Sequence, residues 1–241
     1  MGLAKLGFLA VLITVAASAP LVANNLDAAN GAETTHASSK ISPAIPLPIQ
    51  SKNPELLGVG KILVASRNLG DPNFAQTVIL LVQYDAGGVV GLILNRRTDL
   101  RVSSVLGDFQ AAKDRSDPVY FGGPVDPHQI RALRKSSTKV DGAMQICAGV
   151  FQISTKTQLE QTLNDRAAPK AFHVYLGYAG WHVDQLQKET ELGAWFVFPG
   201  DAETIFKFEP DLLWPQMIRK TEMQMARNKS IDALDERAYL P

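Results

Sequence analysis

The sequence predicts an α/β (α+β) domain organised around a β-sheet, whose centre is the stretch from Lys61 to Arg97. This stretch contains three runs rich in Val, Ile and Leu, each about as long as one strand, and two turn-like breaks separate them. Such runs are typical of central strands that are buried on both faces of a sheet. Further along the chain, strand-like runs alternate with helical patterns, so both kinds of element are expected.

The two breaks differ in their turn chemistry. The second, Asp85-Ala86-Gly87-Gly88, carries glycines that can take the positive φ required by a short hairpin loop. The first, Gly70-Asp71-Pro72-Asn73-Phe74, combines turn formers with one aromatic residue that can pack back into the core.

The rest of the chain is expected to supply short strands and helices in succession. After the opening unit these are a helix over Arg101–Asp108 with Val102, Val105 and Leu106 on one side, strands at Val119–Phe121, Gln129–Leu133, Met144–Ile153 and Phe172–Tyr178, a turn at Gly177–Trp181, a helix over Asp184–Glu191, and a last strand at Ala194–Phe198.

Two further helices are predicted from more specific signals. Thr155 and Gln158 have the spacing of a capping box, which predicts a helix that ends near Arg166. A closing helix is expected from Trp214 to about Arg227, because Pro215 suits a first helical turn. Its inner face is expected to carry Met217, Ile218 and Met225.

The start of the chain is typical of a secretory signal peptide. Lys5 precedes an apolar run from Leu6 to Ala17, and Ala17-Ser18-Ala19 follows the pattern of a cleavage site, so residues 1–23 are interpreted as a leader. The alternatives are an uncleaved membrane anchor, for which the run is short, and an incorrect start codon. The leader predicts an exported protein, periplasmic or secreted, and the alternative is a cytoplasmic one.

The remaining chain divides by composition. Residues 24–54 are expected to be a disordered, proline-rich linker, because they have too little apolar periodicity to pack. The folded domain is expected to span residues 55–227, and residues 228–241 to form a loosely attached tail.

Charge and cysteine content exclude several classes of protein. Lys plus Arg and Asp plus Glu each number 24, so the formal net charge is zero, which argues against a nucleic-acid binder that works by bulk electrostatics. The single cysteine, Cys147, rules out an intramolecular disulfide and any site with several cysteine ligands. It lies in an apolar run, where a free cysteine is most often a small buried hydrophobic residue.

Several short motifs occur together and in one order along the chain. They are Asp71-Pro72-Asn73-Phe74, the strand end Gly91–Asn95, Gly122-Gly123-Pro124-Val125, and Gly177-Tyr178-Ala179-Gly180-Trp181 with Gln185, Leu186 and Glu189, followed by Trp195 and Trp214. In this combination the chain resembles the YqgE/AlgH family over about Gly60 to Lys220.

The resemblance implies a compact domain whose strongly bulged, mostly antiparallel sheet forms a barrel-like core with helices outside. The family is often labelled a transcriptional regulator, after a member linked to alginate production, and no established enzymatic activity comes with that label. Three features depart from the family. Arg97 replaces the usual proline and frees φ there. Asp184 replaces the usual glycine, a mild change at a helix N-cap. The leader is unusual because family members are ordinarily cytoplasmic.

Seven residues are candidates for contact with a ligand: Asn95, Arg96, Gly122, Gly123, Trp181, Gln185 and Glu189. Gly122 and Gly123 allow backbone N–H groups to approach an anion closely, although the same glycines suit a tight turn that packs the barrel. Asn95 and Arg96 end a buried strand, where side chains often line pockets. Equally, an asparagine there can satisfy loop backbone groups while the arginine is exposed.

The third group of candidates lies near the predicted turn. Trp181 lies just before the predicted helix, and Gln185 and Glu189, four residues apart, share one face of that helix, so both polar groups can point into one cleft. His182, Asp184 and Glu189 do not match any zinc spacing. The sequence also contains no P-loop, dinucleotide fingerprint, nucleophile elbow or H-E-x-x-H motif. We therefore expect no metal ion, no cofactor and no catalytic residue.

Three functional classes remain. The favoured one is a non-catalytic regulatory or interaction protein with an unknown protein partner. The alternative is a small-molecule-binding protein or enzyme with a pocket near Asn95, Gly122–Gly123 and Trp181–Glu189. A direct DNA-binding regulator is disfavoured by the zero net charge and the leader, and no stable membrane insertion is expected after leader cleavage.

Overall fold

The computed structural model describes residues 56–207 and 209–223. The predicted leader, linker and tail, and Met225 of the predicted closing helix, lie outside them. Within these residues, ten strands form one sheet: β1 (Lys61–Ala65), β2 (Val78–Asp85), β3 (Gly88–Ile93), β4 (Arg97–Arg101), β5 (Pro118–Phe121), β6 (Val125–Lys135), β7 (Met144–Cys147), β8 (Val150–Ile153), β9 (Phe172–Trp181) and β10 (Trp195–Pro199). The helices are α1 (Val102–Val105), α2 (Lys156–Asn164), α3 (Val183–Glu191), α4 (Ala202–Phe206), two short 3-10 turns and a closing helix over residues 210–223.

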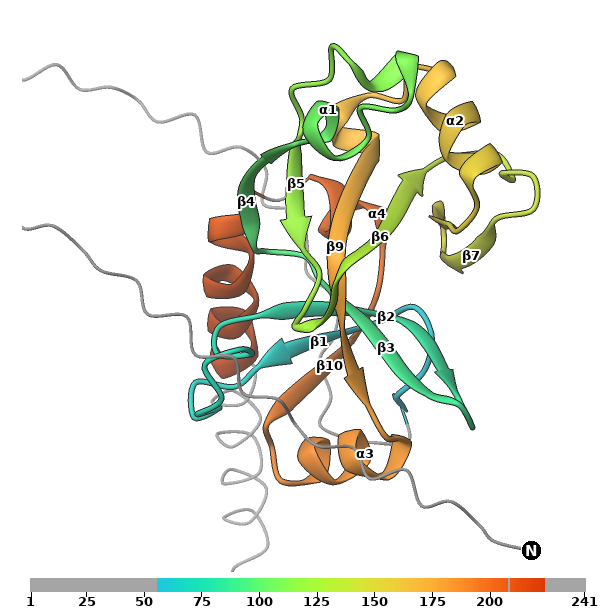
Figure 1. Cartoon of the computed structure of the whole chain (residues 1–241). Helices are drawn as coiled ribbons and strands as arrows, with labels where there is room; N and C mark the ends of the chain where they lie inside the picture. The colour runs from blue at the N-terminus through green and yellow to red at the C-terminus, as the bar shows by residue number, and fades with distance from the viewer. Residues whose placement is uncertain (1–55, 208, 224–241) are drawn as a thin grey trace, which may run out of the picture. The chain divides into compact units, whose positions relative to one another are not determined.

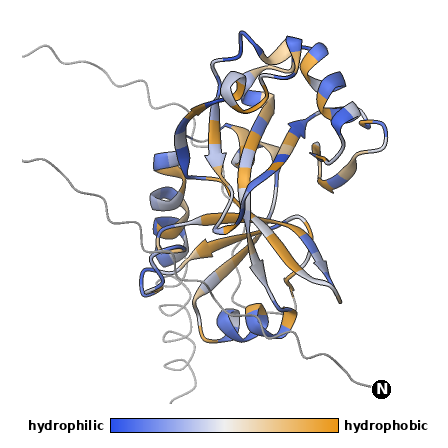
Figure 2. Ribbon diagram, in the orientation of Figure 1, coloured by the Kyte–Doolittle hydropathy of each residue, from blue (hydrophilic) through white to orange (hydrophobic). Residues whose placement is uncertain are grey.

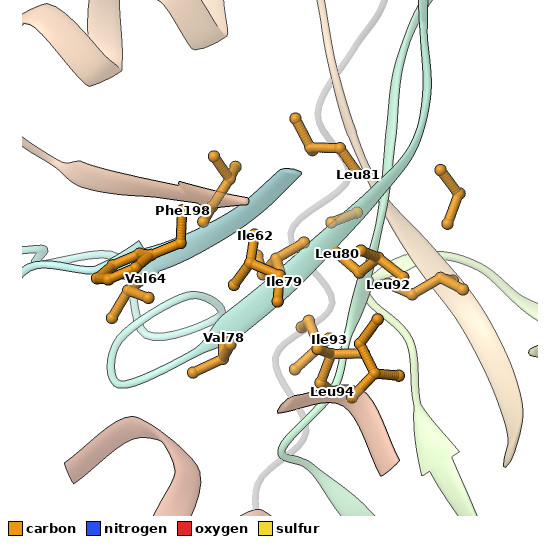
Figure 3. Packing of buried hydrophobic residues seen from close by; sticks show 14 of the residues in the cluster. Ile62, Val64, Val78, Ile79, Leu80, Leu81, Leu92, Ile93, Leu94 and Phe198 are labelled. Carbon is orange, nitrogen blue, oxygen red and sulfur yellow. The ribbon is translucent and has the colours of Figure 1, made fainter. Parts of the chain in front are cut away.

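The predicted strand nucleus is confirmed. β1, β2 and β3 pair antiparallel in succession, and the Val, Ile and Leu side chains of their central residues are buried. Figure 3 shows these side chains packed together with Phe198 of β10. The β2–β3 hairpin turns at Ala86 and Gly87, between the paired residues Asp85 and Gly88. Gly88 has φ +125°, and the Gly87 N–H donates to the Asp85 side chain over 2.7 Å.

β9 is the strand at which the sheet branches. It pairs antiparallel with β3 and β6, and parallel with β5. Register shifts interrupt the β2–β3, β4–β5, β6–β9 and β7–β8 pairs, so the sheet is strongly bulged and mostly antiparallel, as expected. In Figure 1, β9 runs through both parts of this curled sheet, from the α2 side to the α3 side.

Two hydrophobic clusters stabilise the domain. The larger contains buried residues of β1, β2, β3 and β10 together with residues of α3, α4 and the closing helix. The smaller lies beneath α1 and α2 and is centred on Phe172 and Val174 of β9. Figure 2 shows the most apolar strands in the part of the sheet that contains β1, β2, β3 and β10, and mixed or polar helices around the sheet, which fits an α+β domain with flanking helices.

Two predicted elements were wrong, and glycines explain both. The single strand expected at Met144–Ile153 is a hairpin of β7 and β8, because Gly149 takes φ +72° and turns the chain. The turn expected at Gly177–Trp181 is instead the second half of β9. Gly177 has φ +69° inside this strand, so it marks a bulge and not a chain reversal. β6 is longer than predicted, and β4 and α4 were not predicted.

The closing helix begins earlier than the sequence suggested. Helical residues start at 210, so Pro215 lies in the second turn and not in the first. Trp214, Met217 and Ile218 are buried, which confirms the expected inner face over the described part of this helix. The capping box of Thr155 and Gln158 is also confirmed at the start of α2.

Candidate functional site

The two glycine motifs pack directly against each other. A Cβ atom on Gly122 would lie 2.3 Å from the carbonyl oxygen of Gly177, and one on Gly177 would lie 2.4 Å from the carbonyl oxygen of Gly123. Gly123 has φ +153°, and its Cβ would meet the backbone of Tyr178 at 2.2 Å. The Gly122 N–H already donates to the carbonyl of Leu176 over 2.7 Å. Both glycines therefore serve close backbone contact, and the Gly122 N–H is used within the sheet.

Asn95 fastens the loop between β1 and β2. Its side-chain oxygen accepts from the N–H of Val78 over 2.8 Å, and its amide nitrogen donates to the carbonyl of Gln76 over 2.9 Å. Gln76 has φ +57°, a conformation that costs energy for a residue with a side chain. Asn95 thus stabilises a strained residue at the end of the loop.

Arg96 reaches the same loop from the other side. Its Nη2 donates to the carbonyls of Pro72 and Ala75, over 3.3 Å in each case. Partial burial lowers the pKa of its guanidinium, and the nearby carboxylate of Asp71 opposes that shift. Neighbouring Arg97, at the position where the family usually has proline, forms an ion pair of 2.7 Å with Glu209.

Trp181, Trp195 and Glu189 form a half-buried polar and aromatic cluster. One carboxylate oxygen of Glu189 accepts from the indole N–H of Trp181 over 3.2 Å and from that of Trp195 over 2.9 Å. Phe74 stacks on Trp181 with ring centroids 5.5 Å apart and meets Trp195 edge-on at 6.0 Å. The expected packing of Phe74 into the core is thereby confirmed. Both tryptophan N–H groups share one acceptor, so Glu189 orients the two rings.

Gln185 stands at the rim of this cluster. It is exposed, and its amide donates to the other oxygen of Glu189 over 2.8 Å. His182 is the N-cap residue of α3, so Asp184 lies in the first turn instead of at the N-cap position considered from the sequence. An acidic residue in a first turn is favourable because of the positive end of the helix dipole.

The seven sequence candidates do not gather around one cavity. Asn95 and Arg96 line a pocket of about 330 Å³ together with Asp211 and Trp214 of the closing helix. A second pocket, of about 530 Å³, lies between the β2–β3 hairpin and the start of α3, where His182 and Asp184 line it. Neither of these two pockets is lined by Gly122, Gly123, Trp181, Gln185 or Glu189.

The structure adds residues that sequence reasoning missed. Asp211 lines the same pocket as Asn95, and only the position of the closing helix brings them together. Tyr120, His173 and Tyr175 form a second buried cluster, in which the rings of Tyr120 and His173 are 4.7 Å apart. Tyr120 on β5 lies far in the sequence from His173 and Tyr175 on β9, and no motif connects them.

Burial changes the acid–base behaviour of two groups. It lowers the pKa of His173 to about 4, and the positive charge of Arg97 adds to this effect. It also raises the pKa of the Cys147 thiol to about 11. His173 is therefore neutral near pH 7, and Cys147 is a thiol at that pH.

The described residues contain neither a cluster of metal-binding side chains nor a membrane-spanning helix. In these residues, no group of three or more His, Cys, Asp or Glu side chains is arranged to hold a metal ion. No helix within residues 56–207 or 209–223 has the length and apolar character needed to span a membrane.

Comparison with known proteins identifies similar sequences and folds. The family model for AlgH-like proteins, DUF179, matches residues 62–226. A UPF0301 protein of Chlorobaculum tepidum is 35% identical over 167 residues, which cover 68% of this chain and 87% of that protein. A UPF0301 protein of Chlorobium phaeobacteroides is 32% identical over 177 residues, which cover 72% and 93% of the two chains.

Two solved structures have a similar fold. The solution structure of the AlgH protein from Pseudomonas aeruginosa matches with a TM-score of 0.51 and 28% identity, over 63% of this chain and 82% of that one. A crystal structure of a protein from Corynebacterium diphtheriae matches with a TM-score of 0.57 and 22% identity, over 68% of this chain and 87% of that one.

Proposed function

The chain belongs to the AlgH-like family, and from the way it uses the family motifs we propose that it is a non-catalytic regulatory or interaction protein. One observation carries this proposal. The polar side chains of the motifs already form hydrogen bonds inside the domain. Asn95 bonds through both the oxygen and the nitrogen of its side-chain amide, and Glu189 bonds through both carboxylate oxygens. A catalytic residue needs a group that is poised toward a substrate. Here these groups orient loops and rings instead.

We propose the surface around the β6 bulge as the contact for a protein partner, and we name it the bulge surface. It consists of Val125, Ile130, Arg131 and Tyr178. Val125 and Ile130 are 39% and 40% exposed, although both are large apolar residues. The guanidinium of Arg131 lies over the Tyr178 ring at 4.9 Å from its centre. Exposed apolar residues next to Tyr and Arg are the composition that protein interfaces favour.

Photo-crosslinking in cells tests this proposal. The photoreactive amino acid p-benzoylphenylalanine is placed at Ile130 in one variant and at Leu192 in another. Leu192 is the matched control because it is 78% exposed and belongs to α3, outside the bulge surface. We expect one discrete adduct from Ile130 that Tyr178→Asp abolishes, and none from Leu192. If Ile130 gives no adduct, or the same adducts as Leu192, the bulge surface is not a partner site.

A second candidate is the small-molecule-binding role, which the pocket at Asn95 and Arg96 favours. We keep Gly122, Gly123, Trp181, Gln185 and Glu189 as proposed ligand contacts of lower rank, because the two pockets described above do not include them. The stabilities of Gly122→Ala and Gln185→Ala separate a structural role from a ligand-binding role at these two positions.

Export of the protein remains a proposal that rests on the leader-like start of the sequence. Cleavage is expected to leave a mature chain beginning near Pro20 or Asn24. N-terminal sequencing of the native protein measures this directly. An intact Met1 on cytoplasmic protein would contradict export.

A further inference from the structure

We propose that the pocket between the end of the β1–β2 loop (residues 75–76) and the closing helix binds a small zwitterion. Arg96 would bind its carboxylate, and Asp211 its ammonium group. We name it the Arg96–Asp211 pocket. The inference rests on the second candidate function, and it adds the chemical class of the ligand. It does not depend on the bulge surface.

The pocket is formed where three separate parts of the chain meet. The end of the β1–β2 loop contributes Gln76, the segment after β3 contributes Arg96, and the closing helix contributes Asp211 and Trp214. Its volume of about 330 Å³ is at the small end of the range for ligand pockets, which begins near roughly 300 Å³. The ligand is therefore small.

The ion pairs around the pocket single out two charged side chains. Arg97 of β4 pairs over 2.7 Å with Glu209, just before the closing helix, and Arg67 of the loop after β1 pairs with Glu222 of that helix. Arg96 and Asp211 lie between these two pairs in the chain and line one pocket. In the described part of the chain, however, they form no ion pair with each other. Complementary charges that line one pocket without contact are suited to a ligand that bridges them.

Arg96 has hydrogen-bonding capacity left for a carboxylate. Its two bonds to loop carbonyls come from one nitrogen, Nη2, and both are long at 3.3 Å. Among the described residues, Nε and Nη1 of Arg96 have no hydrogen-bond acceptor. A guanidinium presents several N–H groups in one plane, which suits two-point binding of a carboxylate.

The walls of the pocket are held in place before any ligand arrives. The Trp214 indole N–H donates to the carbonyl of Ala65 over 2.8 Å, and the Arg67 guanidinium lies 5.5 Å from the centre of the ring. On the other wall, Asn95 bonds the carbonyl of Gln76 and fixes the strained end of the loop. A pre-formed site loses less entropy when it binds a ligand.

NMR titration of the full chain tests the proposal. The probes are glycine, β-alanine, 4-aminobutyrate and 6-aminohexanoate, which separate the two charges by increasing lengths. Acetate and methylammonium, each carrying only one charge, are the comparison probes at equal ionic strength. We expect at least one zwitterion to give saturable shifts of the Gln76 amide and the Asn95 side-chain amide. Its affinity should exceed that of either single-charge probe at least tenfold.

Variants assign the two charges. Arg96→Gln and Asp211→Asn should each weaken the best zwitterion at least tenfold. Arg97→Gln is the matched control, because it removes a neighbouring ion pair of the same helix and should leave the affinity unchanged. Asp211 is exposed, so Asp211→Asn is expected to fold normally and keeps the test valid if Arg96→Gln does not.

Three results would overturn the proposal. The first is the absence of saturable shifts with all four zwitterions. The second is equal affinity for acetate and for the best zwitterion, which would remove any role for Asp211. The third is a ligand-free double-mutant cycle in which Arg96 and Asp211 are coupled as strongly as Arg97 and Glu209. In that case the two side chains pair with each other in solution. None of these results affects crosslinking at Ile130, so the two proposals fail separately.

Discussion

The backbone of Gly177 fills the space that a side chain on Gly122 would need, and the backbone of Gly123 fills the space that a side chain on Gly177 would need. A Cβ on Gly122 would lie 2.3 Å from the carbonyl oxygen of Gly177, and a Cβ on Gly177 would lie 2.4 Å from the carbonyl oxygen of Gly123. The two glycine-containing motifs are therefore one structural unit, although more than fifty residues separate them in the sequence. This unit holds the β5–β6 turn against the bulge in β9.

The first prediction follows from this contact. Gly122→Ala and Gly177→Ala should each lower the free energy of unfolding by about 1–3 kcal/mol, because a Cβ meets backbone that cannot move aside. Gly58→Ala is the control, since no heavy atom lies within 4 Å of its Cβ position. Chemical denaturation of the three variants measures the effect. Equal stability of Gly122→Ala and Gly58→Ala would contradict the close packing.

The second prediction separates Asn95 from Gln185. Asn95→Ala should cost about 1–3 kcal/mol, because it leaves the Val78 N–H and the Gln76 carbonyl without their partner. Gln185→Ala should change stability by less than about 0.5 kcal/mol, because its side chain is exposed and makes one bond to Glu189. Thermal melts compare the two. A neutral Asn95→Ala would favour a ligand-binding role for Asn95 over a structural one.

The third prediction concerns pH. The pKa of His173 is lowered to about 4 in the folded state, against an ordinary value near 6.5. Between these values the unfolded chain binds a proton that the folded chain does not, so stability falls as pH decreases from about 6.5 to about 4. The loss attributable to His173 is up to about 3 kcal/mol. His173→Phe should remove this part of the pH dependence, whereas His128→Gln, which changes an exposed histidine, should not. Urea titrations at several pH values measure it, and identical pH profiles for wild type and His173→Phe would refute it.

The fourth prediction concerns Cys147. Burial raises the pKa of its thiol to about 11, so at pH 8 very little thiolate is present. Because the thiolate is the reactive form, iodoacetamide should modify the folded protein at least about tenfold more slowly than the urea-unfolded chain. Intact mass measured over time gives both rates. Comparable rates would mean that the thiol is accessible and ionised in the folded state.

The fifth prediction is that the protein does not bind DNA specifically at physiological salt. Its formal net charge is zero, and neutralising phosphates requires clustered positive charge. Fluorescence anisotropy with labelled duplexes, repeated at several salt concentrations, provides the measurement. A nanomolar complex with one duplex that weakens steeply with salt would show that the prediction is wrong.

The sequence predicted most of the sheet because its central strands carry an unmistakable local signal. The three apolar runs and the glycine-rich hairpin loop are enough to predict β1, β2 and β3, and the capping box is enough to predict where α2 begins. Elements whose form depends on distant contacts were missed. β4 reads RTDLR, which has no apolar periodicity, and it is a strand because it pairs with β5.

The candidate site was predictable only in part, for the same physical reason. Asn95 and Arg96 were found from their place at the end of a buried strand, and both lie beside a pocket. Asp211 comes from a different part of the chain, and only the docked closing helix brings it near Arg96. Glu189 was identified as a polar residue near Trp181, but its bond to Trp195 depends on how α3 and β10 pack together.

The pairing of β1 with β10 has a consequence for the order in which the domain folds. Lys61 pairs with Pro199, so the first strand of the described sheet gains one of its two neighbours only when almost the whole domain has been made. Likewise, β3, β5 and β6 each pair with β9, so their pairing is complete only after β9 has been synthesised. Contacts between such distant positions slow folding, and a chain still attached to the ribosome would expose the unpaired edges of its most apolar strands. During synthesis, the nascent chain is therefore expected to need chaperone protection until residues 172–199 have left the exit tunnel.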